Sequence, residues 1–449
     1  MTPAVKIQQR DWLTALALAS IGALFRLWHL ASIKGFIFDE IYYAKDAHSL
    51  IQHGVELTAN GAPDFIVHPP MGKWLIGLGI QAFGFNEFGW RIAAALIGSA
   101  SIALMYFTAQ KLFNKYFISV LASTLILLDG LHLVHSRTAL LDIFLMFWLQ
   151  CALLALLNSK HIWTGIFLAL ATATKWTGLY YILSIFLFVL YVDYRSQKAM
   201  EKSKPLLTTV KDFLPKRILQ YWIVPTLIYL STFLGWFFNR SGYDRAWASH
   251  RGGFWSFIPA PIRSLLHYQS EVLNFHKNLH DPHPYSANPW SWLIMGRPVS
   301  FYYTESATCG SKKCVREVLG LGTPILWWLA TVSLLTLFGY WLTRREWRSG
   351  LILIMVCAGY LPWFAFQKRT MFSFYAIAFE PFLMLAIAYL CNELLSTSRN
   401  ERELKLRKKA ILGALLLIAI CFIYYLPLYL GQSISYSAWL AHMWLPSWI

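Results

Sequence analysis

The stretch DWLTALALASIGALFRLWHLAS, Asp11–Ser32, is followed within a few residues by FIFDEIYY, Phe36–Tyr43. The first stretch is an apolar run of the length that a helix needs to span a membrane, roughly 20 residues. The second places two adjacent carboxylates, Asp39 and Glu40, at the rim of that span. Ionised acids are costly at this depth, so these two are functional candidates from the start.

The composition of the whole chain repeats the character of its first span. Hydrophobic residues make up 57% of the 449 residues and charged residues 14%, and the mean hydropathy is +0.47. Long apolar runs recur from one end to the other, which excludes a soluble globular protein. The first run lacks a small-residue cleavage site, so we expect a retained helix rather than a cleaved signal peptide. The sequence predicts an all-α polytopic membrane protein with a single domain, residues 1–449.

The apolar runs predict about eleven transmembrane helices. They lie near residues 12–31, 90–110, 117–131, 138–157, 161–173, 178–194, 218–238, 322–342, 350–366, 373–395 and 411–430. With the N-terminus inside, the basic links between spans all fall on the cytoplasmic side, as the positive-inside rule requires. The largest of these links are the basic segments 195–217 and 396–410.

The formal net charge is +17, and its distribution favours a membrane role over nucleic-acid binding. The basic residues cluster in the short links between apolar runs, where they set the topology and meet anionic lipid headgroups. We therefore expect membrane lipids as neighbours and no nucleic acid.

The same topology places two long segments outside, residues 33–89 and 239–321. The first contains a half-apolar helix, Trp74–Phe85, that is too short to span and is expected to lie in the membrane interface. The second is rich in Trp, His, Pro and Arg. No internal repeat and no soluble domain of ordinary size is evident, so any chemistry is expected on the outer face.

Asp39 and Glu40 allow two interpretations. They are either solvated interfacial charges, one of them paired with a nearby arginine, or part of a catalytic site. Partial desolvation between bulky apolar neighbours would raise a carboxylate's pKa and make it a better base. Adjacent residues on a helix point about 100° apart, so the two acids are expected to do different jobs.

The segment DFIVHPPMGKW, Asp64–Trp74, holds His68 rigidly next to Pro69 and Pro70. Two prolines fix φ, and Pro70 suits the first turn of the helix that follows. His68 is either incidental to this helix start or a binding residue near the membrane surface.

Three cations lie at expected outer ends of helices: Arg91, Arg137 and Lys175. A cation at a helix end commonly extends to the headgroups, which is the alternative for each one alone. Three of them beside a carboxylate pair would suit a phosphate. Asp142 follows Arg137 closely and is also a candidate partner for it.

The second outer segment offers candidates for a metal site and for a disulfide. His276, His280 and His283 lack a tight ligand pattern and a clear carboxylate partner, so no metal site is assigned, and a divalent metal is left open without being favoured. Cys309 and Cys314 share the polar loop TCGSKKCVRE, and an oxidising compartment favours a disulfide between them over zinc binding. The other four cysteines lie in apolar runs, where inert thiols are expected.

A carboxylate, several cations and a groove open to lipid favour glycosyl transfer from a lipid-phosphate sugar. Phosphate leaves without a general acid if cations stabilise its developing charge. One base is enough to deprotonate the acceptor hydroxyl in an inverting displacement. A glycosidase needs two carboxyl groups on either side of the bond, roughly 5–9.5 Å apart, which adjacent residues do not supply by themselves.

An ordered set of motifs resembles the polyprenyl-phosphate-mannose protein O-mannosyltransferase family, membrane glycosyltransferases of the GT-C type. The resemblance covers essentially the whole chain. It implies eleven spans and inverting mannosyl transfer on the outer face to Ser/Thr hydroxyls of secreted or membrane proteins. The motifs are FDEIYYAKDAHSLIQHG, VHPPMGKWLIGLGIQAFG, FGWRIAAALIG, SRTALLDIFLMF, TKWTGLYY, HPYSANPWSWLIMGRPVSFYY, QKRTMFSFYAIAFEPF and AWLAHMWLPSWI.

The resemblance also implies roles for individual residues. Asp39 matches the family's proposed catalytic base, and Glu40 is its neighbour in the acidic pair. The acceptor-side loop motif is matched by His68, Pro69 and Pro70. Cations near the donor phosphate are implied at Arg91, Lys175 and Arg137.

One departure from the family separates this chain from its eukaryotic members. Those carry a large β-trefoil domain in the second outer loop, and about 80 residues do not hold it. The chain therefore resembles bacterial members, which implies the plasma membrane, a multi-pass topology and secretion-coupled acceptors, with the translocation machinery as a candidate partner. The alternatives are a related GT-C transferase moving another sugar, such as an aminoarabinose, onto a lipid or glycan, and a transporter, which the one-sided placement of the polar motifs disfavours.

Overall fold

The computed structural model describes residues 6–309 and 312–449, except for the side chains of residues 306–309 and 312. The N-terminal half of the chain is helical throughout. Its helices are α1 (Gln9–Leu27), α2 (Glu40–His53), α3 (Met71–Phe83), α4 (Glu87–Phe113), α5 (Tyr116–Leu127), α6 (Gly130–His135), α7 (Asp142–Leu157), α8 (His161–Thr172), α9 (Thr177–Ala199), α10 (Pro205–Thr208), α11 (Leu214–Ile218), α12 (Val224–Thr232) and α13 (Leu234–Phe238).

The C-terminal half adds a small sheet to the helices. Its elements are α14 (Ala260–Asn278), β1 (Val299–Cys309), β2 (Lys312–Gly320), α15 (Pro324–Arg344), α16 (Trp347–Tyr360), α17 (Glu380–Ser396), α18 (Glu401–Tyr429), β3 (Ser433–Ser435) and α19 (Tyr436–His442). Two π-helical turns, Thr209–Phe213 and Leu219–Ile223, join α10, α11 and α12 into one rod.

The structure has a helix at each of the eleven predicted spans. Among the described residues, five helices are long and apolar enough to cross a membrane: α4, α9, α15, α16 with its continuation to Phe366, and α18. The apolar helices α5, α7 and α8 are shorter. The chain is therefore a multi-pass membrane protein, and the count of eleven stays a prediction.

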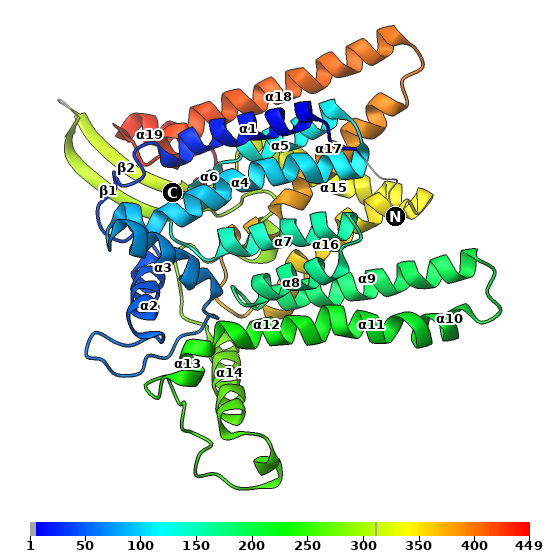
Figure 1. Cartoon of the computed structure of the whole chain (residues 1–449). Coiled ribbons are helices and arrows are strands. Elements are labelled where there is room, and N and C mark those ends of the chain that lie inside the picture. The colour runs from blue at the N-terminus through cyan, green and yellow to red at the C-terminus, as the bar shows by residue number, and fades with distance from the viewer. Residues whose placement is uncertain (1–5, 310–311) are drawn as a thin grey trace.

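The long helices run roughly side by side, and the polar motifs gather at one end of them (Figure 1). At that end α2 and α3 lie across the ends of the bundle, the β1–β2 hairpin projects, and α14 extends sideways. The links between α9 and α10 and between α17 and α18 lie at the opposite end, and the basic segments 195–217 and 396–410 include these links. The bundle therefore has a basic end and a motif-bearing end, which we call the outer end.

The expectation of an all-α fold omits a three-stranded antiparallel sheet. β1 pairs with β2, and β2 pairs with β3 near the C-terminus. The strand sequences VSFYYTESATC and KKCVREVLG are rich in β-branched and aromatic residues, which fit a pleated, half-buried surface. The fold is thus mostly helical, with a small sheet formed by two strands of the second outer segment and by β3 near the C-terminus.

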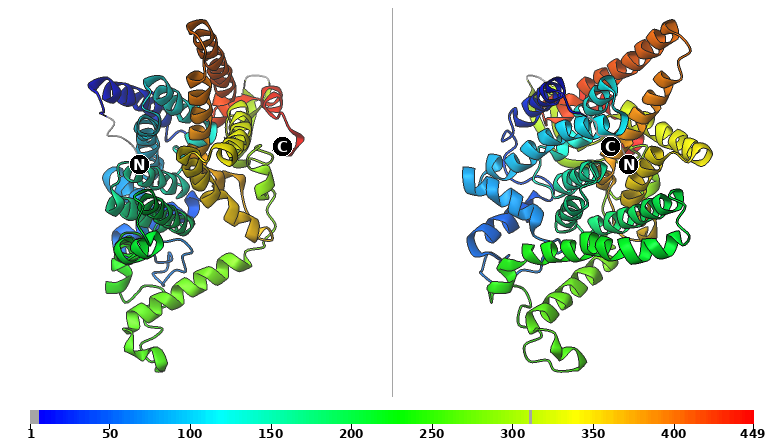
Figure 2. Two further views of the ribbon diagram at one scale, coloured as in Figure 1. Left: turned by 90° about the vertical axis from the view of Figure 1, so that its right-hand side faces the viewer. Right: turned by 45° about the vertical axis from the view of Figure 1, so that its right-hand side comes forward.

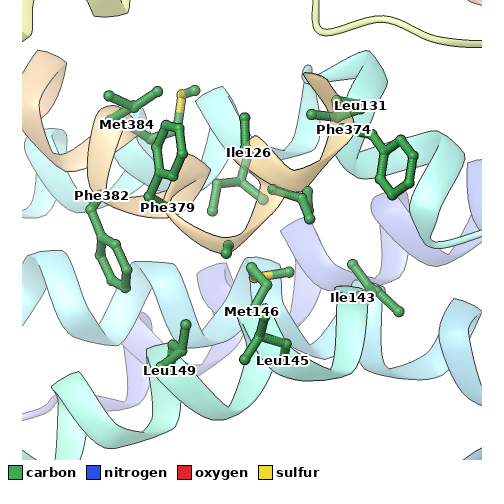
Figure 3. Packing of buried hydrophobic residues seen from close by; sticks show 14 of the residues in the cluster. Ile126, Leu131, Ile143, Leu145, Met146, Leu149, Phe374, Phe379, Phe382 and Met384 are labelled. Carbon is green, nitrogen blue, oxygen red and sulfur yellow. The ribbon is translucent and has the colours of Figure 1, made fainter. Parts of the chain in front are cut away.

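The core of the bundle is apolar and close-packed (Figure 3). Ile143, Met146 and Leu149 of α7 lie across from Phe379 and Phe382 at the start of α17. Deleting a large side chain from such a core typically costs about 2–5 kcal/mol. This packing makes α7, the helix that begins with Asp142, a rigid support for the outer end.

A separate apolar cluster holds the two outer segments together. Leu265, Tyr268 and Val272 of α14 pack against Val55 and Phe233. The Tyr268 hydroxyl donates a hydrogen bond to the carbonyl oxygen of Ile66, at 2.8 Å. The second outer segment is therefore fixed to the segment that carries the HPP motif.

Candidate active site

Asp39 occupies the N-cap position of α2, directly after a residue with unusual backbone geometry. Phe38 has φ +49°, in the left-handed region that non-glycine residues rarely adopt. Its ring stacks on Phe301 of β1, with centroids 4.8 Å apart, and meets Phe372 and Phe374 edge-on. Aromatic packing therefore holds the turn that sends Asp39 and Glu40 in different directions.

Glu40 is fully buried and fully paired. Its carboxylate accepts two hydrogen bonds from Arg91, Nε to Oε1 at 2.8 Å and Nη2 to Oε2 at 2.7 Å. Further hydrogen bonds to it come from the backbone N–H groups of Ile37 and Ala139 and from the Trp90 indole. This arrangement fits a structural junction between three segments, and the catalytic role implied for Glu40 stays a prediction that its burial does not favour.

Arg91 has no donor left for a ligand. Besides the two bonds to Glu40, Nη1 donates to the carbonyl oxygens of Leu30 and Ile33, and Nη2 donates to that of Gly35. A guanidinium has five N–H donors, so all five are used. The phosphate-binding role implied for Arg91 stays a prediction that this geometry does not favour.

Arg137 closes the C-terminal end of α1. Its Nη1 donates to the carbonyl oxygens of Phe25, Arg26 and Trp28, and Nη2 donates to that of His29. The last carbonyl groups of a helix lack partners within the helix, and a cation there also suits the helix dipole. Its implied place at the donor phosphate is likewise unsupported by these contacts.

Lys175, in contrast, lies in a cavity at the outer end of the bundle. The cavity has a volume of about 380 Å³, and most of its lining is apolar. Side chains from the first outer segment, α7, the link between α8 and α9, α9, α14 and the segment between α16 and α17 line it. They are His68, Asp142, Leu145, Lys175, Trp176, Thr177, Leu179, Tyr180, Leu273, His276, Lys277, Pro362, Trp363, Phe366, Arg369, Tyr375 and Ala378.

Asp142 holds the Lys175 ammonium in place. Lys175 Nζ lies 2.7 Å from Asp142 Oδ2 and 5.3 Å from the centroid of the Tyr375 ring. The sequence offered Arg137 as the partner of Asp142, and the structure corrects this, because Arg137 turns away to α1 while α7 starts at Asp142 beside the cavity. Lys175 is thus a positioned charge on the cavity wall.

The Asp39 carboxyl group is close enough to this wall to interact with it electrostatically. Burial raises the pKa of Asp39 to about 6, while Lys175 lowers it, Asp142 raises it, and a hydrogen bond with Tyr43 lowers it. An aspartate with this pKa is ionised at neutral pH and is a stronger base than an ordinary one. The structure therefore brings together two of the residues selected from the sequence, Asp39 and Lys175.

His68 also lines the cavity, and Pro69 and Pro70 anchor it. Both prolines are buried, Pro70 is the N-cap of α3, and the N–H of Met71 donates to the carbonyl oxygen of Ala173, two residues before Lys175. Burial, followed by the charge of Lys175, lowers the pKa of His68 well below its ordinary value. His68 is therefore a neutral imidazole on the cavity wall.

Sequence reasoning missed Arg369 and the role of His276. Arg369 Nη2 lies 3.3 Å from His276 Nδ1, and His276 Nε2 lies 3.0 Å from the carbonyl oxygen of Val67. Burial, followed by Arg369, lowers the pKa of His276 to about 4, so the ring is neutral and accepts from the arginine. The buried Arg369 Nε has no hydrogen-bond partner among the described residues. The motif QKRTMFSFY contained this arginine, but nothing in its spacing indicated the cavity.

The three histidines considered for a metal are engaged in holding loops. His276 bonds to Val67 and Arg369, His280 lies 2.8 Å from the carbonyl oxygen of Lys368, and the N–H of Tyr285 donates to His283. Within the described part of the chain, no group of three or more His, Cys, Asp or Glu side chains is arranged to hold a metal ion.

One of the two loop cysteines is described. Cys314 of β2 is disulfide-bonded, and Cys151, Cys357, Cys391 and Cys421 are free. The side chain of Cys309 lies outside the described residues, so the pairing of Cys309 with Cys314 stays a prediction.

Two family models match the chain. Residues 67–215 match the model described as "Dolichyl-phosphate-mannose-protein mannosyltransferase", and residues 261–448 match "C-terminal four TMM region of protein-O-mannosyltransferase". Together they include His68, Arg91, Lys175, His276 and Arg369.

Solved structures with the same fold are also found. A chain of the S. cerevisiae protein O-mannosyltransferase Pmt1–Pmt2 complex, bound to the sugar donor, aligns over 99% of this chain and 93% of its own, with a TM-score of 0.81 and 15% identity. ArnT from Cupriavidus metallidurans, bound to undecaprenyl phosphate, aligns over 94% of this chain and 77% of its own, with a TM-score of 0.57 and 13% identity. These likenesses show a GT-C fold.

Curated relatives match over nearly their full length. The polyprenol-phosphate-mannose–protein mannosyltransferase of Corynebacterium glutamicum is 28% identical, covering 99% of this chain and 95% of its own. The protein of the same name from Mycobacterium tuberculosis is 33% identical, covering 98% of this chain and 92% of its own. With that identity over almost its entire length, the chain belongs to the polyprenol-phosphate-mannose–protein mannosyltransferase family.

Proposed function

We propose that this protein transfers mannose from a polyprenyl-phosphate-mannose lipid to Ser or Thr hydroxyl groups of proteins. The observation that carries the proposal is the convergence of Lys175, Arg369 and His68 on one largely apolar cavity, with the Asp39 carboxyl electrostatically coupled to it. The names of the full-length relatives and the donor-bound yeast structure support the choice of sugar and acceptor.

Asp39 acts as the general base in this proposal. Its carboxylate takes the proton of the acceptor hydroxyl as that oxygen forms a bond to C1 of mannose. The bond between C1 and the phosphate oxygen breaks in the same displacement, so the configuration at C1 inverts. The products are the mannosylated protein and polyprenyl phosphate, and the proton stays on Asp39 until solvent removes it.

Lys175 and Arg369 stabilise the phosphate as it leaves. Two cations aimed at the developing charge remove the need for a general acid. Asp142 orients the ammonium of Lys175, and His276 orients the guanidinium of Arg369, which lines the same cavity. Arg91 and Arg137 act further out, as positioning residues that hold the segments before α2 and before α7.

The acceptor approaches from the side of the HPP motif. His68 is neutral and rigidly held, so it presents a hydrogen bond to a peptide group without competing with Asp39 for the proton. Pro69 and Pro70 fix its backbone, which keeps the distance between acceptor and base constant.

The apolar part of the cavity suits the first isoprene units of the donor lipid. Leu179 and Tyr180 of α9 lie at its edge, and both are partly exposed on a helix that is apolar enough to span the membrane. A lipid chain lying along this surface would keep its phosphate at the level of Lys175. We take the site to be open to the bilayer on this side.

The proposed location is the plasma membrane of a bacterium, with the site on the outer face. The support is the distribution of charge, since the basic segments 195–217 and 396–410 lie at the end of the bundle opposite the cavity (Figure 1). Secreted polypeptides are then the acceptors, and the translocation machinery is a candidate partner.

The experiment uses the purified protein in proteoliposomes with radiolabelled polyprenyl-phosphate-mannose and a peptide rich in Ser and Thr. We expect label on the peptide hydroxyls, none with the Asp39→Asn variant, and inversion at C1. Label on a lipid or glycan instead of the peptide would identify the related GT-C transferase. Passage of intact donor across the bilayer without transfer would identify a transporter.

A further inference from the structure

Helix α14 carries two apolar stripes, of which the protein covers one. Leu265, Tyr268 and Val272 are buried in the cluster that joins the outer segments. Ile262, Leu266 and Leu273 are exposed, and we call them the outer stripe. Their spacing places all three within about 40° of one another around the helix, since each residue advances by about 100°. The three side chains of the outer stripe thus lie on one face of the helix.

The turn before α14 exposes aromatic side chains to an unusual degree. The turn formed by residues 253–258, which we call the aromatic turn, contains Phe254, Trp255 and Phe257, whose side chains are 83%, 61% and 71% exposed. Single exposed apolar residues are normal on a protein surface, but a contiguous group of large ones marks an interaction site.

The aromatic turn is held in place by ordered contacts. Arg263 of α14 donates from Nε to the carbonyl oxygen of Ile258 at 3.1 Å and from Nη1 to that of Arg251 at 2.7 Å. The N–H of Ala248 donates to the Ser264 hydroxyl at 3.0 Å. The helix therefore presents its preceding turn in a fixed position, with the three rings directed away from the protein core.

The position of α14 relative to the bundle indicates what covers the outer stripe. α14 leaves the bundle at the outer end of α12 and runs across the direction of α9 and α12, with the aromatic turn at the end away from the bundle (Figure 1). Seen from the basic end of the bundle, α14 lies lengthwise below the other helices (Figure 2, left). A helix perpendicular to the spanning helices, at their outer end, runs in the plane of the membrane surface.

The neighbouring surface of the bundle is lipid-facing. Leu183 and Leu187 of α9 and Leu227 of α12 are exposed on helices that lie beside the start of this extension. Exposed leucines on spanning helices meet acyl chains. The outer stripe and the aromatic turn add further exposed apolar side chains beside this surface, at the outer end of the bundle.

The excess of basic residues in residues 239–278 suits binding to an anionic membrane surface. Residues 239–278 contain five Arg or Lys residues, at 240, 245, 251, 263 and 277, and two acidic residues, Asp244 and Glu271. Basic residues close to an anionic membrane surface are attracted to it. Aromatic rings with adjacent basic residues are typical of interfacial helices.

We propose that α14 and the aromatic turn lie in the headgroup region of the bilayer, with Ile262 and Leu266 of the outer stripe and the aromatic rings inserted among the upper acyl chains. Leu273, His276 and Lys277 of the same helix line the cavity. Seating α14 on the bilayer therefore fixes the height of the cavity relative to the lipid headgroups. This inference concerns a membrane-binding surface and holds whatever sugar the protein transfers.

The test is photo-cross-linking of the full chain in proteoliposomes made of equal parts of phosphatidylcholine and phosphatidylglycerol. The photoreactive residue p-benzoylphenylalanine replaces Phe257 in one variant and the exposed Tyr303 of β1 in the control. We expect phospholipid adducts at position 257 several-fold above those at 303, identified by mass spectrometry. Adducts to a second copy of the chain, or no lipid adducts above the control, would overturn the proposal.

A second pair of variants tests the orientation of the helix. The same residue replaces Leu266 in the outer stripe or Glu271, which lies about 140° away around α14. We expect lipid adducts at position 266 and few at 271, with both variants eluting as the wild-type protein does in size-exclusion chromatography. Equal adduct yields at the two positions would show that the outer stripe does not face lipid. Neither measurement requires turnover, so its outcome is independent of the proposed transferase activity.

Discussion

Arg91 and Glu40 form a fully buried ion pair in which both guanidinium edges and both carboxylate oxygens are engaged. The pair joins the segment before α2 to α4, and the N–H of Ala139 ties the segment before α7 to the same carboxylate. Asp39, the adjacent residue, is not part of this pair and is coupled to Lys175 instead. The two neighbouring acids therefore have different surroundings, Glu40 in a buried ion pair and Asp39 in electrostatic contact with Lys175.

The Glu40→Gln variant is expected to be unstable rather than selectively inactive. Removing one partner of a buried ion pair leaves an uncompensated charge and costs about 3–5 kcal/mol. We expect a lower unfolding temperature in detergent, measured by intrinsic fluorescence, and near-normal donor affinity in the folded fraction. A stable Glu40→Gln protein without turnover would instead place Glu40 in the catalytic machinery.

The Asp39→Asn variant is expected to lose turnover while keeping its fold. A general base contributes typically about 10²–10⁴ to the rate, and asparagine has the same shape without the basic oxygen. We expect kcat to fall by that factor with little change in the unfolding temperature or in donor affinity. Near wild-type kcat would remove Asp39 from the role of base.

The pH dependence of the reaction should report the pKa of Asp39. Burial raises that pKa to about 6, and the base works only in its deprotonated form. The value of kcat/KM should therefore fall about tenfold per pH unit below about pH 6 and level off above it. The measurement is a profile on the wild-type protein with peptide acceptor. A value of kcat/KM that does not fall toward low pH between about pH 8 and about pH 4.5 would contradict the role of Asp39 as the base.

The Lys175→Ala and Arg369→Ala variants are expected to bind the lipid donor more weakly. A hydrogen bond to a charged group contributes about 1.5–3 kcal/mol, which corresponds to roughly a 10- to 150-fold loss of affinity. The measurement is titration of donor by the proteins in nanodiscs, together with apparent KM. Lys34→Ala is the matched control, because Lys34 is an exposed cation on the same outer side, paired with Glu87. Unchanged donor affinity in both variants would show that the donor phosphate binds at another place in the protein.

Activity is expected to persist in excess chelator. In the proposed mechanism a carboxylate accepts the proton, and Lys175 and Arg369 stabilise the phosphate, so no step calls for a metal ion. The measurement is the transfer rate with and without EDTA after dialysis of the protein. If EDTA abolished the activity and added divalent metal restored it, the reaction would depend on a metal ion, and residues of the site would have to bind that ion.

Several features of the fold and the site were predictable from the sequence because they depend on local patterns. Apolar runs located a helix at each expected span, since burying about 20 apolar residues in a bilayer needs no tertiary information. Pro69 and Pro70 likewise predicted a rigid helix start, because proline fixes φ whatever surrounds it. The β1–β2 hairpin was missed, because the prediction of an all-α fold followed from the apolar runs and the hairpin lies in the segment between two of them.

The site was harder to predict, because its parts are distant in the sequence. Arg91, Arg137 and Lys175 looked equivalent, each a cation at the outer end of a helix. They differ in what surrounds them in the folded protein. Arg91 is bonded to carbonyl oxygens and to Glu40, and Arg137 is bonded to carbonyl oxygens at the end of α1. Lys175 lines a cavity. Arg369 joined the site for the same reason, since α14 carries His276 to it across the chain.

Hydropathy, charge distribution and an ordered set of motifs were sufficient to specify a polytopic membrane protein and its family, and they predicted FIFDEIYY as the catalytic segment. These depend on transfer free energies and residue order, which a linear chain already contains. Tertiary packing alone decided which acid of that segment is buried in an ion pair with Arg91 and which lies outside that pair. The reason is physical: a pKa and a free hydrogen-bond donor depend on desolvation and on neighbouring charges, and those exist only once the chain is folded.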